Sequence, residues 1–249
     1  MTQEIELKLT LPARALPALR RHPLVASASR EGAATTLDNT YYDTPELTLK
    51  ARKIAVRTRK QGRQWLQTVK CAAVSTGGLS QRPEWEQPYA SQFDFSAIDH
   101  ADVAKVLTQH QDALVPVFTT RFRRETRRYA PREGLCILMM IDTGEVIVGD
   151  RKHPICELEL ELVEGKASDL LELACELAQK LPLMPGDVSK AQRGYQLFLD
   201  LPVRPAKSEP VALQPDISVI DAFRSLAHAC LRQWQANAAA AAEGHDGPE

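Results

Sequence analysis

The sequence predicts an α+β protein in which eight β-strands can close into a barrel. Short segments that alternate between apolar and charged residues, the period of a strand, dominate the first two thirds of the chain. Segments with apolar residues at helical spacing lie between and after them. The length of 249 residues is enough for one large domain, or for one domain with part of another.

The opening residues show the alternation most clearly. Glu4, Glu6 and Lys8 fall on one face of a strand, and the aliphatic residues between them fall on the other. Turn-forming residues at 75–78 separate the fourth predicted strand from the fifth. The strands are expected at residues 3–9, 35–43, 52–60, 64–71, 81–88, 118–130, 135–148 and 153–163.

Helices are expected where apolar residues recur every three or four positions. The clearest case is 167–181, which Ser168 can cap at its start. The other predicted helices of this region are 12–21, 45–50, 101–111 and 189–199.

Charge and cysteine content argue against several classes of function. The net charge of -1 gives no electrostatic case for binding nucleic acid or an anionic membrane. The five cysteines are dispersed and include no CxxC pair, which argues against a zinc site or a disulfide framework. No apolar run approaches membrane-spanning length, and the chain starts without an apolar leader. We therefore expect a cytoplasmic protein that binds neither nucleic acid nor membrane.

Like charges recur at every second position of several strands. Acidic residues occupy positions 4 and 6, 84 and 86, and 157, 159 and 161, and arginines occupy 57 and 59, and 121 and 123. For any single strand, a charged face turned toward water is the simpler interpretation. Over the whole chain this segregation favours an enclosed site. Hard divalent cations neutralise clustered carboxylates, and arginine pairs bind phosphate oxygens. The pattern therefore indicates a metal–polyphosphate complex, the pairing used in phosphoryl transfer.

The segment Glu4-Ile5-Glu6-Leu7-Lys8 resembles the ExExK signature of the CYTH superfamily, the triphosphate tunnel metalloenzymes. One such signature is weak evidence, because strands produce it easily. The resemblance is specific because it covers about residues 1–200 with motifs in the family's order. The further motifs are Tyr41-Tyr42-Asp43-Thr44, Arg57-Thr58-Arg59, Thr68-Val69-Lys70, Arg82-Pro83-Glu84-Trp85-Glu86, Arg121-Phe122-Arg123-Arg124, Asp142-Thr143-Gly144, Glu157-Leu158-Glu159-Leu160-Glu161 and Ser189-Lys190-Ala191-Gln192-Arg193-Gly194-Tyr195.

The resemblance implies an antiparallel tunnel with a charged lining, which hydrolyses or cyclises triphosphates with Mg²⁺ or Mn²⁺, and we expect two ions. It implies that Asp142, Glu157 and Glu159 hold one ion. It also implies that Glu4 and Glu6 hold or orient a second ion and its water, with Lys8 in the same catalytic group. Further expected lining residues are Glu84, Glu86 and Glu161. The implied phosphate ligands are Lys8, Arg57, Arg59, Lys70, Arg82, Arg121, Arg123 and Lys190.

Several of these motif residues have a simpler structural interpretation. Asp142 could begin a turn, and Glu161 could be a solvated strand end. Lys190 could be a surface lysine at the start of a helix. We expect Arg124 at the surface or in an ion pair, and Asp43 as a cap at a strand end.

The composition changes near residue 200. We predict a tunnel domain over residues 1–202, a proline-rich linker over 203–215 and a helical segment over 216–249. A helix over 218–237 has an apolar face that needs a partner. The partner could be the main domain, a second copy in a homodimer, or a missing C-terminal domain.

Residues 211–237 resemble the first helix of a CHAD domain, a helical module associated with polyphosphate. A CYTH–CHAD fusion is similar to bacterial inorganic triphosphatases. We therefore expect hydrolysis of inorganic triphosphate (tripolyphosphate) to pyrophosphate and phosphate. The alternatives are a class IV adenylate cyclase, a thiamine triphosphatase, or a polyphosphate-binding module without turnover.

Overall fold

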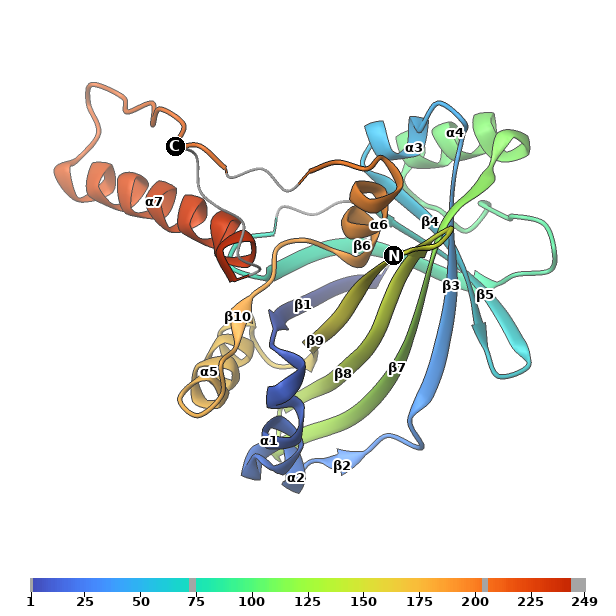
Figure 1. Ribbon diagram of the computed structural model, residues 1–249. Helices are drawn as coiled ribbons and strands as arrows, with labels where there is room; N and C mark the ends of the chain where they lie inside the picture. Colours follow the sequence, from blue (N-terminus) through green and yellow to red (C-terminus); the bar gives the residue numbers. More distant parts are fainter. Residues whose placement is uncertain (1, 72–74, 203–205, 243–249) are drawn as a thin grey trace. The chain divides into compact units, whose positions relative to one another are not determined.

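A computed structural model describes residues 2–71, 75–202 and 206–242 (Figure 1). The chain divides into two compact units, Met1–Asp200 and Leu201–Glu249. Residues 203–205 of the predicted linker and 243–249 of the predicted helical segment lie outside the described residues.

The first unit contains the closed eight-stranded antiparallel barrel that the sequence predicts. The ring closes because β1 (Thr2–Thr10) pairs with strands on both sides. Two short strands, β2 (Ser29–Arg30) and β10 (Met184–Pro185), pair with β7 and β1. From β1, the ring continues through β6 (Leu79–Pro88), β5 (Gln64–Cys71), β4 (Ile54–Gln61), β3 (Thr35–Asp43), β7 (Val115–Arg132), β8 (Leu135–Val148) and β9 (Arg151–Glu164).

Apart from α6 (Lys190–Phe198), which contributes residues to the cavity lining, the helices of this unit lie outside the strands (Figure 1). The predicted helix at 12–21 is a 3₁₀ turn, η1 (Ala13–Ala15), followed by α1 (Leu16–Arg21). A separate helix, α2 (Pro23–Ser27), begins at Pro23, because proline suits the first turn of a helix but not its interior. The remaining elements are α3 (Thr48–Ala51), α4 (Ala101–His110), η2 (Gln111–Ala113), α5 (Ala167–Ala178) and α6 (Lys190–Phe198). None of the helices in the described part of the chain is long and apolar enough to cross a membrane.

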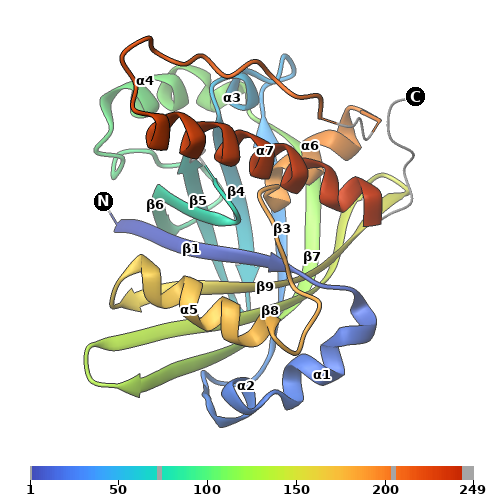
Figure 2. The same cartoon turned by 90° about the vertical axis from the view of Figure 1, so that its left-hand side faces the viewer.

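The apolar faces of the strands point outward, as the alternation in β1 predicts. Leu7 and Leu9 pack in a core with Leu170 and Leu177 of α5. Figure 2 shows α5 lying along β1 and β9. Burying these aliphatic side chains between barrel and helices supplies the main stabilising contribution. The opposite faces of the same strands are thereby turned inward.

A second outer core lies over β4, β5 and β6. Leu49 of α3 and Leu107 of α4 pack with Val56 and Val69. Trp85 also belongs to this core. Because side chains alternate along a strand, its neighbours on both sides face the interior.

Helix α6 packs against β7, β8 and β9. Gly194 makes this approach possible, since a Cβ at this position would overlap the ring of Phe118. Tyr195 meets the same ring edge-on, with the ring centroids 5.1 Å apart. The helix begins at the cap Ser189, whose Oγ accepts a hydrogen bond from the Gln192 backbone nitrogen at 3.1 Å. This placement brings Lys190 to the barrel interior.

The second unit contains one long helix, α7 (Val219–Ala242). Ser218 caps its start, where the Asp221 backbone nitrogen donates to the Ser218 Oγ at 3.1 Å. Within this unit, the Asn237 side chain donates to the Ala206 carbonyl at 2.9 Å. The CHAD resemblance and the partner expected for the apolar face stay predictions.

Candidate functional site

The barrel contains a cavity of about 860 Å³ with a strongly charged lining. Nine basic and seven acidic side chains belong to the described lining. Among the predicted phosphate ligands, it includes Lys8, Arg57, Arg59, Lys70, Arg82 and Lys190. Among the predicted carboxylates, it includes Glu4, Glu6, Glu84, Glu86, Glu159 and Glu161. Asp142 and Glu157 are fully buried directly behind this lining.

Arg121 and Arg123 do not line the cavity, which corrects the prediction for the second arginine strand. Their side chains are 66% and 55% exposed, and they pair with Asp38 and Glu125. Arg124, expected at the surface or in an ion pair, is ion-paired with Asp142 and in addition lines the cavity. The physical reason is the strand period: Phe122 faces the interior, so the residue two positions later does too.

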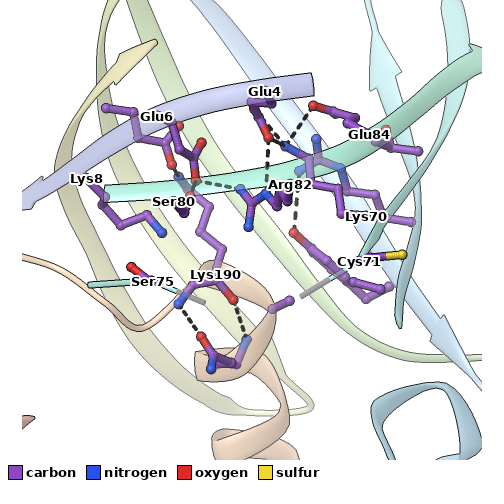
Figure 3. Close-up of a pocket in the computed structure, with 18 of the residues that line it drawn as sticks. Glu4, Glu6, Lys8, Lys70, Cys71, Ser75, Ser80, Arg82, Glu84 and Lys190 are labelled. Atoms are coloured by element: carbon purple, nitrogen blue, oxygen red, sulfur yellow. Dashed lines mark hydrogen bonds and ion pairs between the residues drawn. The ribbon is translucent and has the colours of Figure 1, made fainter. Parts of the chain in front are cut away.

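One side of the lining, formed by Glu4, Glu6, Glu84 and Glu161, is called the open acidic wall below. Cross-strand pairing brings these residues together, because Glu4 lies opposite Arg82, Lys70 opposite Glu84, and Glu6 opposite Glu161. Figure 3 shows Glu4, Arg82, Lys70 and Glu84 meeting across the strands.

Two cations are ion-paired with this wall. The Lys70 Nζ lies 2.8 Å from Glu4 Oε2 and 3.0 Å from Glu84 Oε2. The Arg82 Nε lies 3.1 Å from Glu4 Oε2, and its Nη2 lies 2.5 Å from Glu6 Oε1. Four carboxylates therefore share two cations, which leaves an excess of negative charge when all four are ionised.

Glu161 carries much of this excess. In the described part of the chain, no residue donates a hydrogen bond to it or forms an ion pair with it. Burial, together with the charge of Glu4, raises the pKa of the Glu161 carboxyl to about 6. Glu161 is thus a lining carboxylate whose oxygens are free to accept a cation.

A second acidic group, Asp142, Glu157 and Glu159, is called the buried triad below. One carboxylate oxygen from each residue lies within 4.8 Å of the other two, and the three residues are buried. The register explains this contact, because Asp142 of β8 lies opposite both Arg124 of β7 and Glu157 of β9.

Three cations neutralise the buried triad. The Lys190 Nζ donates to Asp142 Oδ2 at 2.7 Å, to Glu159 Oε1 at 2.9 Å and to Glu157 Oε1. Arg124 donates to both oxygens of Asp142, at 2.8 and 2.6 Å, and to Glu159 Oε2 at 2.6 Å. Arg193 donates to Glu157 Oε2. All six carboxylate oxygens accept a hydrogen bond, and three charges face three opposite charges.

The ionisation of this cluster is strongly favoured. Burial opposes the charge of Lys190, but the three carboxylates outweigh it and raise the pKa of its ammonium. Burial likewise opposes ionisation of Glu159, yet Lys190, Arg124 and Lys8 hold its pKa well below the usual range. The Lys190 Nζ also lies 4.8 Å from the centroid of the Phe122 ring, a cation–π contact. All three donors of Lys190 are used inside the cluster.

Lys8 and Arg57 differ from the other interior cations because neither forms an ion pair with a described carboxylate. Lys8 is 5% exposed, and its backbone is held by Gly78 and Gly186, each through a hydrogen bond of 2.9 Å. The Arg57 Nη1 donates to the Tyr41 hydroxyl at 3.4 Å, while its buried Nε has no acceptor among the described residues. Lys8 and Arg57 therefore have N–H donors that remain available to bind an anion.

Asp43, predicted as a cap at a strand end, is the last residue of β3 and joins both α3 and α6 to the barrel. Its carboxylate accepts hydrogen bonds from the backbone nitrogens of Leu49 and Lys50 at 2.7 and 2.9 Å. It also accepts one from the Tyr195 hydroxyl at 2.7 Å. Burial, followed by this hydrogen bond, raises the pKa of the Tyr195 hydroxyl. One buried aspartate thereby holds the end of β3, α3 and α6 together.

Both acidic groups offer carboxylate oxygens, the ligands that Mg²⁺ and Mn²⁺ prefer. They differ in how many of those oxygens are free. In the buried triad, an ion can use the oxygens only if Lys190 or an arginine moves away. In the open acidic wall, Glu161 is already free to bind. The donor chemistry fits a divalent metal at both groups, and the hydrogen bonding favours the wall.

Two residues of this site were missed by sequence reasoning. Arg193 was not assigned a role, although it follows Lys190 by three positions and so lies on the same helix face. Arg124 was assigned to the surface or an ion pair, although it follows the inward-facing Phe122 by two positions. The helical and strand periods, applied from one known inward residue, would have identified both.

Comparison of the sequence with known proteins identifies a family and a relative. The model of the CYTH domain matches residues 2–195. An inorganic triphosphatase of Haemophilus influenzae is 30% identical over 197 residues, which are 79% of this chain and 55% of that protein. The chain therefore spans about half the length of this relative.

A solved structure from Hippeastrum, described as a putative adenylyl cyclase with a dominant triphosphatase activity, is also similar. It aligns with a TM-score of 0.56 and 20% identity, covering 78% of this chain and 95% of that chain. At this level of identity, the similarity supports the fold and nothing more specific.

Proposed function

Because this chain belongs to the CYTH domain family, we propose that its tunnel hydrolyses inorganic tripolyphosphate to pyrophosphate and phosphate with a bound divalent metal. Metal dependence is general for the family. The observation that carries the proposal is a pair of buried cations, Lys8 and Arg57, that have no carboxylate partner among the described residues. The same cavity contains the carboxylate of Glu161, which has no partner among them either. A site for a metal-free anion would need the cations but not the carboxylates.

The phosphates are bound by the basic side chains of the lining. Lys8 and Arg57 can bind phosphate oxygens without breaking an ion pair. Arg59, Lys70 and Arg82 can share their donors between a carboxylate and a phosphate, since guanidinium and ammonium groups carry several N–H donors. Lys190 does not donate a hydrogen bond to the phosphates in this proposal, because its three donors bind the carboxylates of the buried triad.

The open acidic wall is the proposed metal site. Glu6 and Glu161 lie opposite each other on β1 and β9, and Glu4 is close enough for its charge to act on Glu161. A divalent ion would offset the negative excess that two cations leave on these four carboxylates. The buried triad, by contrast, is neutral as it stands. Its role in this proposal is to hold Arg124 and Lys190 at the lining.

When bound, the metal supplies charge neutralisation for the triphosphate and a lower pKa for a coordinated water. The protein's own residues then perform positioning and charge stabilisation, which account for most of phosphoryl-transfer catalysis. Lys8, Arg57 and Arg124 face the phosphate chain from β1, β4 and β7, so they hold it from several sides. Glu4 and Glu6 separate hydrolysis from simple anion binding, and Glu4→Gln or Glu6→Gln is expected to lower kcat sharply.

The nature of the lining supports inorganic triphosphate over a triphosphate with an organic group. The aromatic side chains in the cavity are engaged with protein: Tyr41 stacks on Phe118 at 4.6 Å, and Phe122 lies against Lys190. Tyr41, Phe122 and Tyr195, the aromatic residues of the described lining, are each 6% exposed or less, which leaves little ring surface for stacking a base. The inorganic triphosphatase named above supports the same substrate.

The test is an assay of phosphate release from tripolyphosphate, ATP and thiamine triphosphate, with Mg²⁺ or Mn²⁺ and with a chelator. We expect release from tripolyphosphate that requires metal and exceeds release from the other two. Cyclic AMP from ATP would support the cyclase alternative, and preferential hydrolysis of thiamine triphosphate would support a thiamine triphosphatase. Tight binding of tripolyphosphate without release would indicate a binding module.

A further inference from the structure

The cavity extends beyond the paired charges to two lysines at its α3 end. Lys50 of α3 and Lys53, just before β4, belong to the cavity lining and are exposed. In the described chain, neither ammonium has a carboxylate partner. Like Lys8 and Arg57, they carry a positive charge that no ion pair with a described carboxylate neutralises. Because their side chains are exposed, they lie near the entrance of the cavity and not inside it.

These lysines continue a row of cations along β4. Arg57 and Arg59 face the cavity from successive inward positions of the strand. The next inward position is Ala55, and there the directly paired residue of β5, Lys70, supplies the charge. Lys53 follows at the end of the row. From residue 53 to residue 59 such a row spans about 20 Å, at about 3.3 Å per residue. A triphosphate, with only three phosphorus atoms, covers part of it.

The backbone that carries the two lysines is held in place. Asp43 accepts a hydrogen bond from the Lys50 nitrogen at 2.9 Å, and the Lys53 nitrogen donates to the Lys50 carbonyl at 3.0 Å. Lys53 has a φ of 58°, a left-handed conformation in which glycine or asparagine is the usual residue. A lysine here carries a conformational penalty, and such outliers cluster at functional sites.

We propose that Lys50 and Lys53 form an entrance subsite for linear inorganic polyphosphate, binding the phosphates that extend beyond the three inside the tunnel. The subsite rests on the proposed function, since it assumes that a phosphate chain occupies the interior. It makes the protein select longer chains over tripolyphosphate. A row of cations suits a ligand that carries a charge on every unit, whereas a nucleoside would leave these lysines without phosphate.

The test compares the double variant Lys50→Gln/Lys53→Asn with the parent and with a control, Lys180→Gln. Lys180 is exposed at the end of α5 and does not line the cavity, so the control removes a charge elsewhere. The measured quantity is the ratio of KM for size-fractionated long-chain polyphosphate to KM for tripolyphosphate. Where the long chain is not hydrolysed, its inhibition constant against tripolyphosphate hydrolysis replaces its KM.

We expect this ratio to rise about three- to tenfold in the double variant, as for two exposed charge contacts, and to stay at the parent value in the control. Asparagine adopts the left-handed conformation more easily than lysine, so the single variant Lys53→Asn is expected to melt no lower than the parent. A loss of long-chain affinity in Lys53→Asn therefore reports the missing charge and not misfolding. An unchanged ratio in the double variant would overturn the subsite. A larger loss of ATP affinity than of polyphosphate affinity would overturn it as well.

Failure of the proposed function gives a different result. If the parent releases no phosphate from tripolyphosphate, hydrolysis is excluded, and the subsite is tested by calorimetric titration of the protein with long-chain polyphosphate. Weaker binding to the double variant than to the Lys180→Gln control supports the subsite. Equal binding overturns it.

Discussion

The buried triad and the open acidic wall lie on neighbouring strands of one barrel, but their charges are balanced differently. The triad has three carboxylates, three cations and no free oxygen. The wall has four carboxylates and two paired cations, and one of the carboxylates, Glu161, has no partner among the residues that the structure describes. A buried charge must be paired to be stable, whereas an unpaired carboxylate in a cavity is available to a ligand. The difference shows that two acidic residues of one motif have different environments: Glu157 is paired with Lys190 and Arg193, whereas Glu161 forms no ion pair with a described residue.

The largest effect is expected from Lys190→Met, which breaks the balance of the triad. It leaves three buried carboxylates with two cations and should lower the free energy of unfolding by about 3–5 kcal/mol. Urea denaturation at neutral pH without metal measures this loss. The double variant Lys190→Met/Glu157→Gln should recover part of it, because two carboxylates then face two arginines. A loss below about 1 kcal/mol, the typical effect of any substitution, would contradict a charge-balanced triad.

A smaller effect, on a different property, is expected from Glu161→Gln in the wall. Titration calorimetry with Mn²⁺ should show an affinity lower by about tenfold or more, as for loss of a carboxylate ligand. The free energy of unfolding should not fall, since the substitution relieves repulsion with Glu4. The matched variant Glu157→Gln should do the reverse, lowering stability while retaining Mn²⁺ binding. If Glu157→Gln abolished metal binding and Glu161→Gln did not, the metal would belong to the triad.

A third variant, Tyr195→Phe, measures how much one of the two contacts that hold α6 to the barrel contributes to stability. The helix is held by the charged triad through Lys190 and by a neutral donor to Asp43 through Tyr195. Removing this hydroxyl should lower the free energy of unfolding by about 1–2 kcal/mol, because Asp43 keeps its backbone donors. Thermal melting gives the value. A loss equal to that of Lys190→Met would mean that the triad is not the stronger attachment.

The smallest effect is expected from Arg121→Gln. This arginine forms an exposed ion pair with Asp38 outside the barrel, where solvent screens the interaction. Neither the melting temperature nor KM for tripolyphosphate should change measurably. Arg124→Gln is the contrasting variant, and it should reduce both stability and turnover, because Arg124 joins the lining to the triad. Equal effects of the two substitutions on stability and turnover would contradict the assignment of Arg124 to the inward face of β7 and of Arg121 to the outward face.

In some strands the residue types alone predict which side chains share a face, and in other strands they do not. In β1, charged and aliphatic residues alternate without exception from Glu4 to Leu9, so only the choice between inside and outside was open. In β7, arginines occupy positions 121, 123 and 124, and therefore both faces. The inward face is decided there by contacts of Phe122 and by the pairing of Arg124 with Asp142. A local pattern cannot distinguish faces that carry the same residue type.

The eight strands of the barrel were predictable from the chain, because the period of a strand is a local property, and the ordered motifs predicted most of the residues that line it. The folded structure was needed to show which carboxylates are already neutralised. The ammonium of Lys190 reaches three acids that are 31 to 48 positions away in the chain, across α6, β8 and β9. Charge balance is a property of groups brought together in space, and spacing along the chain does not contain it. For this reason the ordered motifs were enough to predict the tunnel. The geometry of the folded barrel was needed to distinguish the neutralised carboxylates of the buried triad from those of the open acidic wall.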